Sequence, residues 1–550
     1  MTRVSKPAAT EFSLADMFEA VAAAVPDRVA IVAPGRRVTY AELDAEADRV
    51  AGHLLAQGVS VGDHVGILAL NCPEWLAALL AIFKLRAVAI NINHRYVADE
   101  LRYLLDNSDT IATFVHRRFA PSLDAVRTGL PRLSHVVVID DDSGEQVPLN
   151  TTSYADAARH EPMADELRAG RSGDDRYIMY TGGTTGLPKG VVWRHEDFFF
   201  AALRGGALGP MPAVTRPGEL AERAIAIRRP VRWLLPAPLH HAGGQWGTLT
   251  ALLTGQTLIQ WTGAHFDAAA IWRLVEQERP HNLGIIGDAM ARPLADALAQ
   301  PGAAYNTSSL LSFGSGGAVF SPAVKEQLHK LLPDVPLMES LGSTETGLDT
   351  VSLQEAADRL TGARPRFALT ADMAVFDDEL RPVQPGSDAI GYIARSGHVP
   401  LGYYKDEERS AKTFPVIEGV RYSIPGDYAR LEADGTVVLL GRGSVSINTG
   451  GEKVWPEEVE SVLKQHPGVF DAVVVGVPDE RWGQQVAAVV AARPDAALDA
   501  DDLDAHCHGK LAAYKRPRRW RIVDEVLRQP SGKPDYRWAA DIAVAESVCG

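Results

Sequence analysis

Residues 180–190 contain residue types that are suited to holding an anion. Glycines let the backbone turn its amides toward one anion, and a lysine in the same loop adds a positive charge. The segment therefore predicts an anion-binding loop. Its candidate binding residues are Thr181, Gly182, Gly183, Thr184, Thr185, Gly186 and Lys189.

Two alternative interpretations of this loop are a Walker loop and a hairpin turn without a ligand. A Walker loop requires Gly-x4-Gly-Lys-Ser/Thr at the start of a helix. Here Pro188 precedes Lys189, Gly190 follows it, and residues 191–193 favour a strand, so a Walker loop is excluded. A glycine-rich hairpin turn without a ligand stays open, although the segment is longer than a tight turn requires.

The segment resembles the signature of the adenylate-forming (ANL) superfamily, which includes acyl-CoA synthetases, peptide-synthetase adenylation domains and firefly-type luciferases. Other family motifs follow in the family's order as far as Lys533, so the resemblance covers nearly the whole chain. It implies a carboxylic acid, ATP and coenzyme A as substrates, with Mg²⁺ as the activating ion. In three places, Leu341, residues 447–453 and residues 208–229, the sequence is similar to actinobacterial fatty-acyl and steroid side-chain CoA ligases.

The resemblance also implies which residues hold the nucleotide. Thr344 matches a threonine at the α-phosphate, and Glu345 matches the glutamate that holds magnesium, a hard cation that prefers carboxylate and phosphate oxygens. Asp427 matches the aspartate that binds the ribose hydroxyls, and Leu341 stands where the family usually has an aromatic residue over adenine. The other nucleotide-binding positions are Ser315, Gly316, Gly317, Ala318, Gly342, Ser343 and Arg442.

Lys533, with Thr344 and Glu345, forms the catalytic set that the resemblance implies. A fixed cation between the acid's carboxylate and the α-phosphate would offset the charge that accumulates as two anions approach. Ser444 occupies the hinge position, which is commonly Asp or Lys in the family. Gly451 and Glu452 belong to a segment that reaches the thioester-forming site after the C-terminal domain rotates.

The acyl site is placed by the same resemblance. His241 lies in a Pro-Leu-x-His segment, residues 238–241, and a satisfied core histidine is the alternative interpretation. Gln245, Trp246, Phe313 and Gly314 surround the expected pocket. Because Trp246, Phe313 and Gly314 carry no charge, a largely apolar acid, fatty or steroid-like, is favoured.

The elements that must position these residues alternate in type. Residues 40–57 and 75–83 have helical spacing, whereas residues 65–70 and 87–92 are strand-like. The alternation returns over residues 258–313. Strand, helix and strand in this order imply parallel sheets and an α/β fold.

The predicted secondary structure changes twice in the second half of the chain. After about residue 365, short strands with turn signals predict a small β subdomain, and residues beyond 446 predict a compact α+β unit with helices over 457–465 and 501–511. We therefore expect an N-terminal adenylation domain of α/β subdomains plus the β subdomain (1–441), a hinge (442–446) and a small mobile C-terminal domain (447–550).

Composition limits the partners and the compartment. The net charge is -15, and no lysine and arginine cluster interleaves with aromatics, so a nucleic acid is not expected. The cysteines, three in number, favour a reducing compartment. The most apolar stretch, residues 75–90, is interrupted by Lys84 and Arg86, so we expect a cytoplasmic protein without an integral membrane segment. A homo-oligomer is compatible with the sequence.

Two other functions stay open. One is a stand-alone adenylating enzyme that loads an acyl carrier protein instead of free CoA. The other is a nucleotide-binding protein that has lost catalysis, an alternative suggested by Leu341, Pro425 and Ser444, which depart from the family pattern.

Overall fold

The computed structural model describes residues 10–148, 150–164, 168–183, 186–209, 211–353, 366–442, 445–449, 452–479, 482–494, 496–508, 510–528 and 533–545. Of the predicted site residues, Thr184, Thr185, Ser444 and Gly451 lie outside the described residues, as do the side chains of Arg442 and Glu452.

Two large mixed sheets form the N-terminal part of the chain. The first has the order β19-β9-β8-β4-β3-β5-β6-β7 and is parallel except where β9 pairs with β8 and β19. Its strands are β3 (His64–Leu68), β4 (Val88–Asn91), β5 (Thr110–His116), β6 (His135–Ile139), β7 (Thr152–Ser153), β8 (Arg176–Gly183), β9 (Gly186–Arg194) and β19 (Gly402–Tyr403).

The second sheet has the order β15-β14-β13-β12-β10-β11-β1-β2, with antiparallel strands at both edges. Its strands are β1 (Val29–Ala33), β2 (Arg36–Thr39), β10 (Arg232–Leu235), β11 (Thr257–Gln260), β12 (Asn282–Ile285), β13 (Ser312–Gly316), β14 (Leu337–Ser343) and β15 (Gly347–Leu353). Parallel strands joined by helices are the architecture that the alternating sequence predicts.

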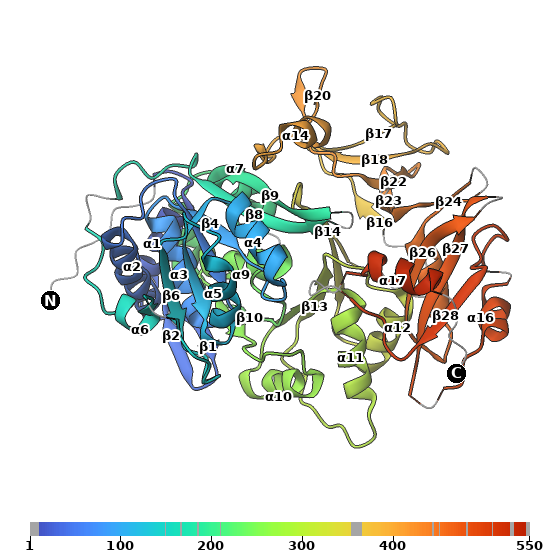
Figure 1. Cartoon of the computed structure of the whole chain (residues 1–550), viewed down its shortest axis with the longest axis horizontal. Coiled ribbons are helices and arrows are strands. Elements are labelled where there is room, and N and C mark those ends of the chain that lie inside the picture. Colours follow the sequence, from blue (N-terminus) through green and yellow to red (C-terminus); the bar gives the residue numbers. More distant parts are fainter. Residues whose placement is uncertain are drawn as a thin grey trace.

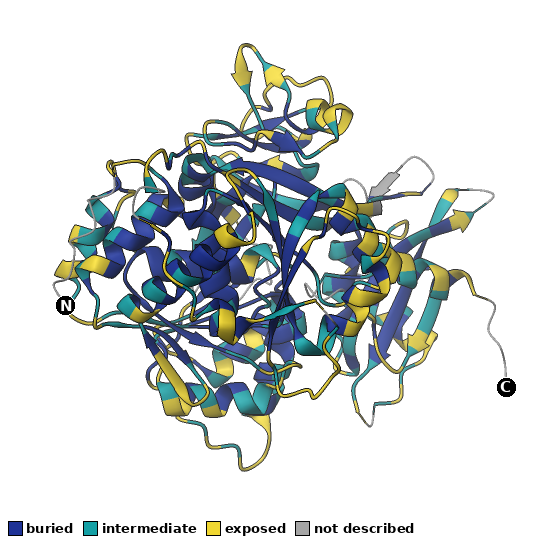
Figure 2. Ribbon diagram, turned by 60° about the vertical axis from the view of Figure 1, so that its left-hand side comes forward, coloured by how far each residue is buried: buried dark blue, intermediate teal, exposed yellow. Residues whose placement is uncertain are grey.

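Helices cover these sheets and fill the space between them. They are α1 (Leu14–Ala24), α2 (Tyr40–Ala56), α3 (Pro73–Lys84), α4 (Ala98–Asn107), α5 (Ala120–Arg127), α6 (Tyr154–Ala157), α7 (His195–Ala202), α8 (Glu219–Ala226), α9 (Ala242–Leu253), α10 (Ala268–Glu278), α11 (Gly287–Ala299) and α12 (Pro322–Leu331), with 3₁₀ turns at Arg117–Phe119 and Arg204–Gly206. The start of α2 shows a local cause, because Thr39 and Glu42 form a reciprocal capping box. Figure 2 shows the strands and inner helices buried and the outer loops exposed.

The small β subdomain predicted after residue 365 is present. Its sheet has the order β16-β23-β22-β18-β17, and a short hairpin and helix extend from it. The strands are β16 (Arg366–Ala368), β17 (Met373–Phe376), β18 (Ile390–Arg395), β22 (Asp427–Leu431) and β23 (Thr436–Arg442), with β20 (Val416–Ile417), β21 (Val420–Arg421) and α14 (Glu407–Thr413) nearby.

A separate C-terminal sheet lies beyond this subdomain, as Figure 1 shows in orange and red beside α11 and α12. Its elements are β24 (Ile447–Thr449), β25 (Glu452–Val454), β26 (Val469–Asp479), β27 (Gly483–Ala492), β28 (Arg519–Val523), α15 (Pro456–Leu463), α16 (Ala500–Cys507) and α17 (Tyr536–Val544). The α/β fold with a large N-terminal and a small C-terminal domain is therefore confirmed.

One predicted helix was too long. The sequence predicts a helix over 501–511, but α16 ends at Cys507 because the backbone of His508 is extended, with φ −64° and ψ 133°. Within the described residues, no helix combines the length and the apolar character that crossing a bilayer requires.

Candidate active site

A cavity of about 1060 Å³ opens between the two N-terminal sheets and extends to the C-terminal unit. Its wall contains backbone and side chains from β8, α9, β13 and β14, together with residues from the segment before α17. The predicted site residues that line it are Thr181, His241, Trp246, Gly314, Ser315, Gly316, Gly317, Gly342, Ser343, Thr344 and Lys533. Residues far apart in the sequence are thus brought to one place.

The proposed phosphate loop is the end of the β-hairpin that β8 and β9 form, which we call the phosphate hairpin. Strands β8 and β9 pair antiparallel, with Thr181 opposite Lys189 and Gly183 opposite Gly186. The hairpin weighed as an alternative is therefore the geometry present, but its base borders the cavity through Thr181 and Pro188. A strand rather than a helix follows Lys189, which agrees with the exclusion of a Walker loop.

Lys189 and Glu345 meet at the same aromatic ring. The Lys189 ammonium lies 5.2 Å from the centre of the Tyr403 ring, and the Tyr403 hydroxyl donates a hydrogen bond of 2.8 Å to Glu345 Oε1. Glu345 is buried, and its backbone carbonyl accepts a hydrogen bond of 2.7 Å from Ser423 Oγ. A single carboxylate next to the hairpin of β8 and β9 fits Mg²⁺, which is commonly bound by one or two carboxylates plus substrate phosphates.

Among residues 315–318, Gly316 is tightly packed and Gly317 leaves open space. Any side chain at Gly316 would collide with Ser340 Oγ, and Gly317 has φ +78° with open space where a Cβ would stand. Ser315 Oγ accepts a hydrogen bond of 3.0 Å from Gly287 N, which fixes the end of β13. Ala318 instead packs against the hydrophobic cluster beneath the sheet.

Three residues predicted at the nucleotide or acyl site point into the protein core. Leu341 packs with Phe367 and other residues of the β subdomain, and Phe313 stacks on Phe320 with 6.3 Å between ring centres. Gln245 is also buried, and none of the three lines the cavity. For Phe313 the cause is strand alternation, because its neighbours Ser312 and Gly314 face the cavity.

Asp427 and Arg442 are paired by the β subdomain. They are register partners of the antiparallel strands β22 and β23. Two positions that family resemblance assigns to the nucleotide separately thus come together, and Asp427 does not line the cavity.

His241 lies at the end of a loop that buried amides hold in place. Asn71 accepts from Leu239 N at 2.8 Å and donates to Ala237 O at 3.0 Å, while Gln245 Nε2 donates to Leu239 O at 2.9 Å. The Gln245 oxygen in turn accepts from the Tyr177 hydroxyl. Gln245 therefore contributes to the site by shaping this loop.

Asn91 links the same loop to the phosphate hairpin. Its Nδ2 donates to His240 O at 2.6 Å and to Tyr180 O at 2.8 Å, and its Oδ1 accepts from Tyr180 N at 2.6 Å. Sequence reasoning missed both Asn71 and Asn91. The available signal was an asparagine inside or directly after a buried apolar run.

The environment of His241 differs from that of a satisfied core histidine. Its Nε2 has no hydrogen-bond partner among the described residues, although the atom is buried. Burial, and then the positive charge of Lys533, lowers the pKa of His241 to about 3. The imidazole is therefore neutral at pH 7, and Lys533 is near enough to affect it.

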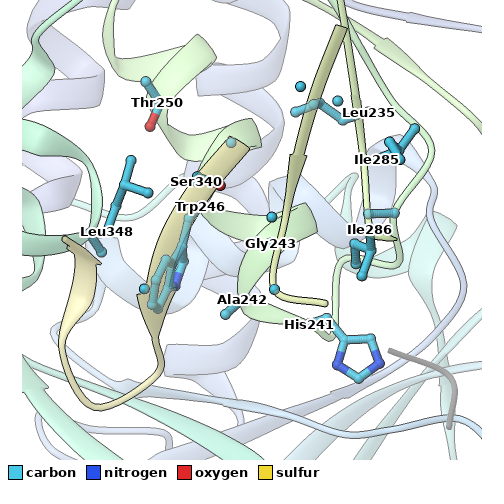
Figure 3. Close-up of a pocket in the computed structure, with 18 of the residues that line it drawn as sticks. Leu235, His241, Ala242, Gly243, Trp246, Thr250, Ile285, Ile286, Ser340 and Leu348 are labelled. Carbon is cyan, nitrogen blue, oxygen red and sulfur yellow. The ribbon is translucent and has the colours of Figure 1, made fainter. Parts of the chain in front are cut away.

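An apolar pocket continues from His241. Figure 3 shows Trp246, Leu235, Ile285, Ile286 and Leu348 around Ala242 and Gly243, with Thr250 and Ser340 also at its wall. Residues 208–229, one of the segments similar to actinobacterial CoA ligases, supply Leu208, Gly209, Met211 and Ile227 to the cavity wall.

Comparison with known proteins gives matches along most of the chain. The family model "AMP-binding enzyme" matches residues 18–404, and "AMP-binding enzyme C-terminal domain" matches residues 458–533.

Individual relatives match over nearly their full length. The 3-oxocholest-4-en-26-oate–CoA ligase of Rhodococcus rhodochrous is 44% identical over 96% of this chain and 95% of its own. The medium/long-chain-fatty-acid–CoA/3-oxocholest-4-en-26-oate–CoA ligase of Mycobacterium tuberculosis is 46% identical over 97% and 96%. The structure of the anthranilate CoA ligase AuaEII in complex with anthranoyl-AMP superposes with a TM-score of 0.83, at 27% identity over 99% and 100% of the two chains.

Proposed function

The chain belongs to the AMP-binding enzyme family, and from that premise we propose that it is an ATP-dependent acid-CoA ligase. The acid's carboxylate attacks the α-phosphorus of ATP, which forms an acyl-adenylate and releases pyrophosphate. The thiol of coenzyme A then attacks the acyl carbon, which forms the thioester and releases AMP.

One observation carries this proposal. A single cavity joins Thr181 and Thr344, on the phosphate side, to an apolar pocket around Trp246, and Lys533 lines it as well. An enzyme that couples a nucleotide to an apolar acid needs these two environments in contact, with a cation where they meet.

Lys533 is proposed as the catalytic cation. Its charge would offset the two anions that approach each other and the charge that develops on the α-phosphoryl group. His241 stays neutral beside it, so the imidazole adds no positive charge next to Lys533. Thr344 would contact the α-phosphate, and Glu345 would hold Mg²⁺, which offsets phosphate charge when bound.

The remaining predicted residues are proposed in the roles that the family resemblance implies. The nucleotide would contact Ser315, Gly316, Gly317, Gly342 and Ser343, and its ribose would contact Asp427. Residues 1–441 would form the adenylation domain and residues 442–446 the hinge. Rotation of residues 447–550 about Ser444 would bring Gly451 to the site for thioester formation.

The acid is proposed to be largely apolar, either fatty or steroid-like. The pocket wall of Leu235, Ile285, Ile286 and Leu348 favours such an acid. Both of the sequence relatives compared above are named as ligases of cholestenoate or fatty acids. A cytoplasmic location is proposed because Cys72 and Cys507 are buried free thiols, as expected in a reducing compartment.

An AMP-release screen tests the function. Acids from acetate through long-chain and polycyclic carboxylates are offered with ATP, Mg²⁺ and CoA, and we expect release with apolar acids. Absence of acid-dependent AMP release with every acid would refute the ligase. Offering free CoA and acyl carrier proteins separately distinguishes the carrier-loading alternative.

A further inference from the structure

A buried lysine joins the C-terminal unit to the N-terminal domain. Lys464, at the C-terminal end of α15, places its ammonium 3.5 Å from Asp288 Oδ2 on α11 and 3.4 Å from Asp471 Oδ1 on β26. The side chains of Lys464 and Asp288 are only 2% and 5% exposed. One cation is therefore shared between a carboxylate of each domain.

The same group of charges leads toward the cavity. Arg528 binds Asp471 through two hydrogen bonds of 2.6 and 2.7 Å, and Arg528 itself lines the cavity. Five residues later the chain reaches Lys533, which lines the cavity too. The contact between α11 and Lys464 is thus continuous, through Asp471 and Arg528, with the segment that carries the proposed catalytic lysine.

Charge compensation within this group is strong. Burial raises the pKa of Asp471, but Lys464 and Arg528 outweigh burial and lower it to about 2. On the other side of the interface, Asp288 Oδ1 accepts a hydrogen bond of 2.9 Å from Ser321 N, which orients the carboxylate toward Lys464. If the C-terminal unit turned away, Lys464 and Asp471 would move together and the Asp288 contact would break.

We propose that Asp288 and Lys464 are a positioning pair that holds the C-terminal unit in the orientation that presents Lys533 to the cavity. This inference rests on the proposed ligase function. The pair favours the adenylate-forming half-reaction, and it must separate before the second half-reaction. Neither residue lines the cavity, so both act through Lys533.

A second charged contact across the interface supplies a matched control. Arg493 lies 3.5 Å from Asp296, which is also on α11, but both side chains are 30% exposed. Solvent-exposed pairs of this kind contribute little because water and salt screen them. Asp296→Asn therefore changes a similar contact without removing a buried charge.

The test measures the two half-reactions separately for Asp288→Asn and Lys464→Met. Acid-dependent exchange of pyrophosphate into ATP should fall by about tenfold in each variant, and the double variant should fall no further because one contact is lost. Thiolysis of a supplied acyl-adenylate by CoA should be retained. Asp296→Asn should resemble the wild type in both assays.

Two outcomes would overturn the positioning pair. One is an equal fall of both half-reactions in Asp288→Asn and in Lys464→Met, which indicates general damage to the fold. The other is wild-type exchange in both variants. If the wild-type chain itself showed no acid-dependent exchange, the proposed ligase function would fail first, which is a distinct result.

Discussion

Lys84 and Lys464 are both buried, but their surroundings differ. Lys84 is 0% exposed and lies within 2.6–2.7 Å of Glu19, Asp44 and Asp48, all in the N-terminal domain. Lys464 has contacts of 3.4–3.5 Å, and one of its partners belongs to the other domain. The short contacts of Lys84, which join α1, α2 and α3, are expected of a cluster that stays intact. The longer contacts of Lys464 are expected of an interface whose two domains separate.

Replacing each lysine by methionine should give the largest contrast. Lys84→Met removes the cation that three buried carboxylates share, although Arg168 still pairs with Glu19 and Asp48, so the free energy of unfolding should fall by about 3–5 kcal/mol. Lys464→Met should lower it less, because it removes longer contacts to two carboxylates and Arg528 still compensates Asp471. Chemical denaturation of both variants measures this difference, and equal losses would remove the distinction between the two clusters.

Acid should lower the free energy of unfolding through His195, which lies in the N-terminal domain near Lys84. Its ring is 5.0 Å from that of Phe83, the residue before Lys84. Burial lowers the pKa of His195 to about 4. An unfolded histidine titrates near pH 6.5. The stability that neutral His195 gives the folded chain is therefore complete above that pH and is lost as the pH falls toward 4. The unfolding free energy should drop by about 1.4 kcal/mol per pH unit in this range.

His195→Asn isolates this effect from the other histidines. The variant should be less stable than the wild type at pH 7.5, and the difference should shrink as the pH approaches 4. Denaturation curves across the range provide the measurement. A difference that is independent of pH would show that folding does not shift the pKa of His195.

Asn91 allows a smaller effect to be tested within the fixed part of the site. Asn91→Leu leaves the polar backbone atoms of Tyr180 and His240 without their partner, so we expect about a tenfold fall in activity. Both half-reactions should fall, unlike in Asp288→Asn, because the phosphate hairpin and the His241 loop belong to the N-terminal domain.

Asn71→Leu is the matched variant for Asn91→Leu. Asn71 holds the His241 loop through Ala237 and Leu239, and among the described residues it has no hydrogen bond to the phosphate hairpin. The KM for ATP should therefore rise in Asn91→Leu and stay near the wild-type value in Asn71→Leu. The same rise in both would contradict a link through Asn91.

The sequence was a good guide to elements whose cause is local. Helical spacing predicted a helix over residues 40–57, where α2 spans Tyr40–Ala56, and the strand-like residues 87–92 contain β4 at Val88–Asn91. Motif resemblance also assigned Thr181, Thr344 and Lys533 to one site, and all three line the same cavity. Their individual roles stay predictions.

Features that depend on distant partners could not be predicted in this way. Asn91 binds groups 89 and 149 positions away, and Asp288 meets Lys464 across 176 positions. The orientation of Phe313 and Leu341 toward the core depends on strand alternation in β13 and β14. A motif match identifies a position, but strand geometry decides which face the side chain occupies.

The central claim is that a lysine of the C-terminal unit acts in the N-terminal cavity during the first half-reaction. Lys533→Ala tests it most directly, with pyrophosphate exchange and thiolysis of a supplied acyl-adenylate measured on the same preparation. The account predicts that exchange falls by about 100 to 1000-fold while thiolysis is largely retained. An equal loss of both, or undiminished exchange, would contradict it.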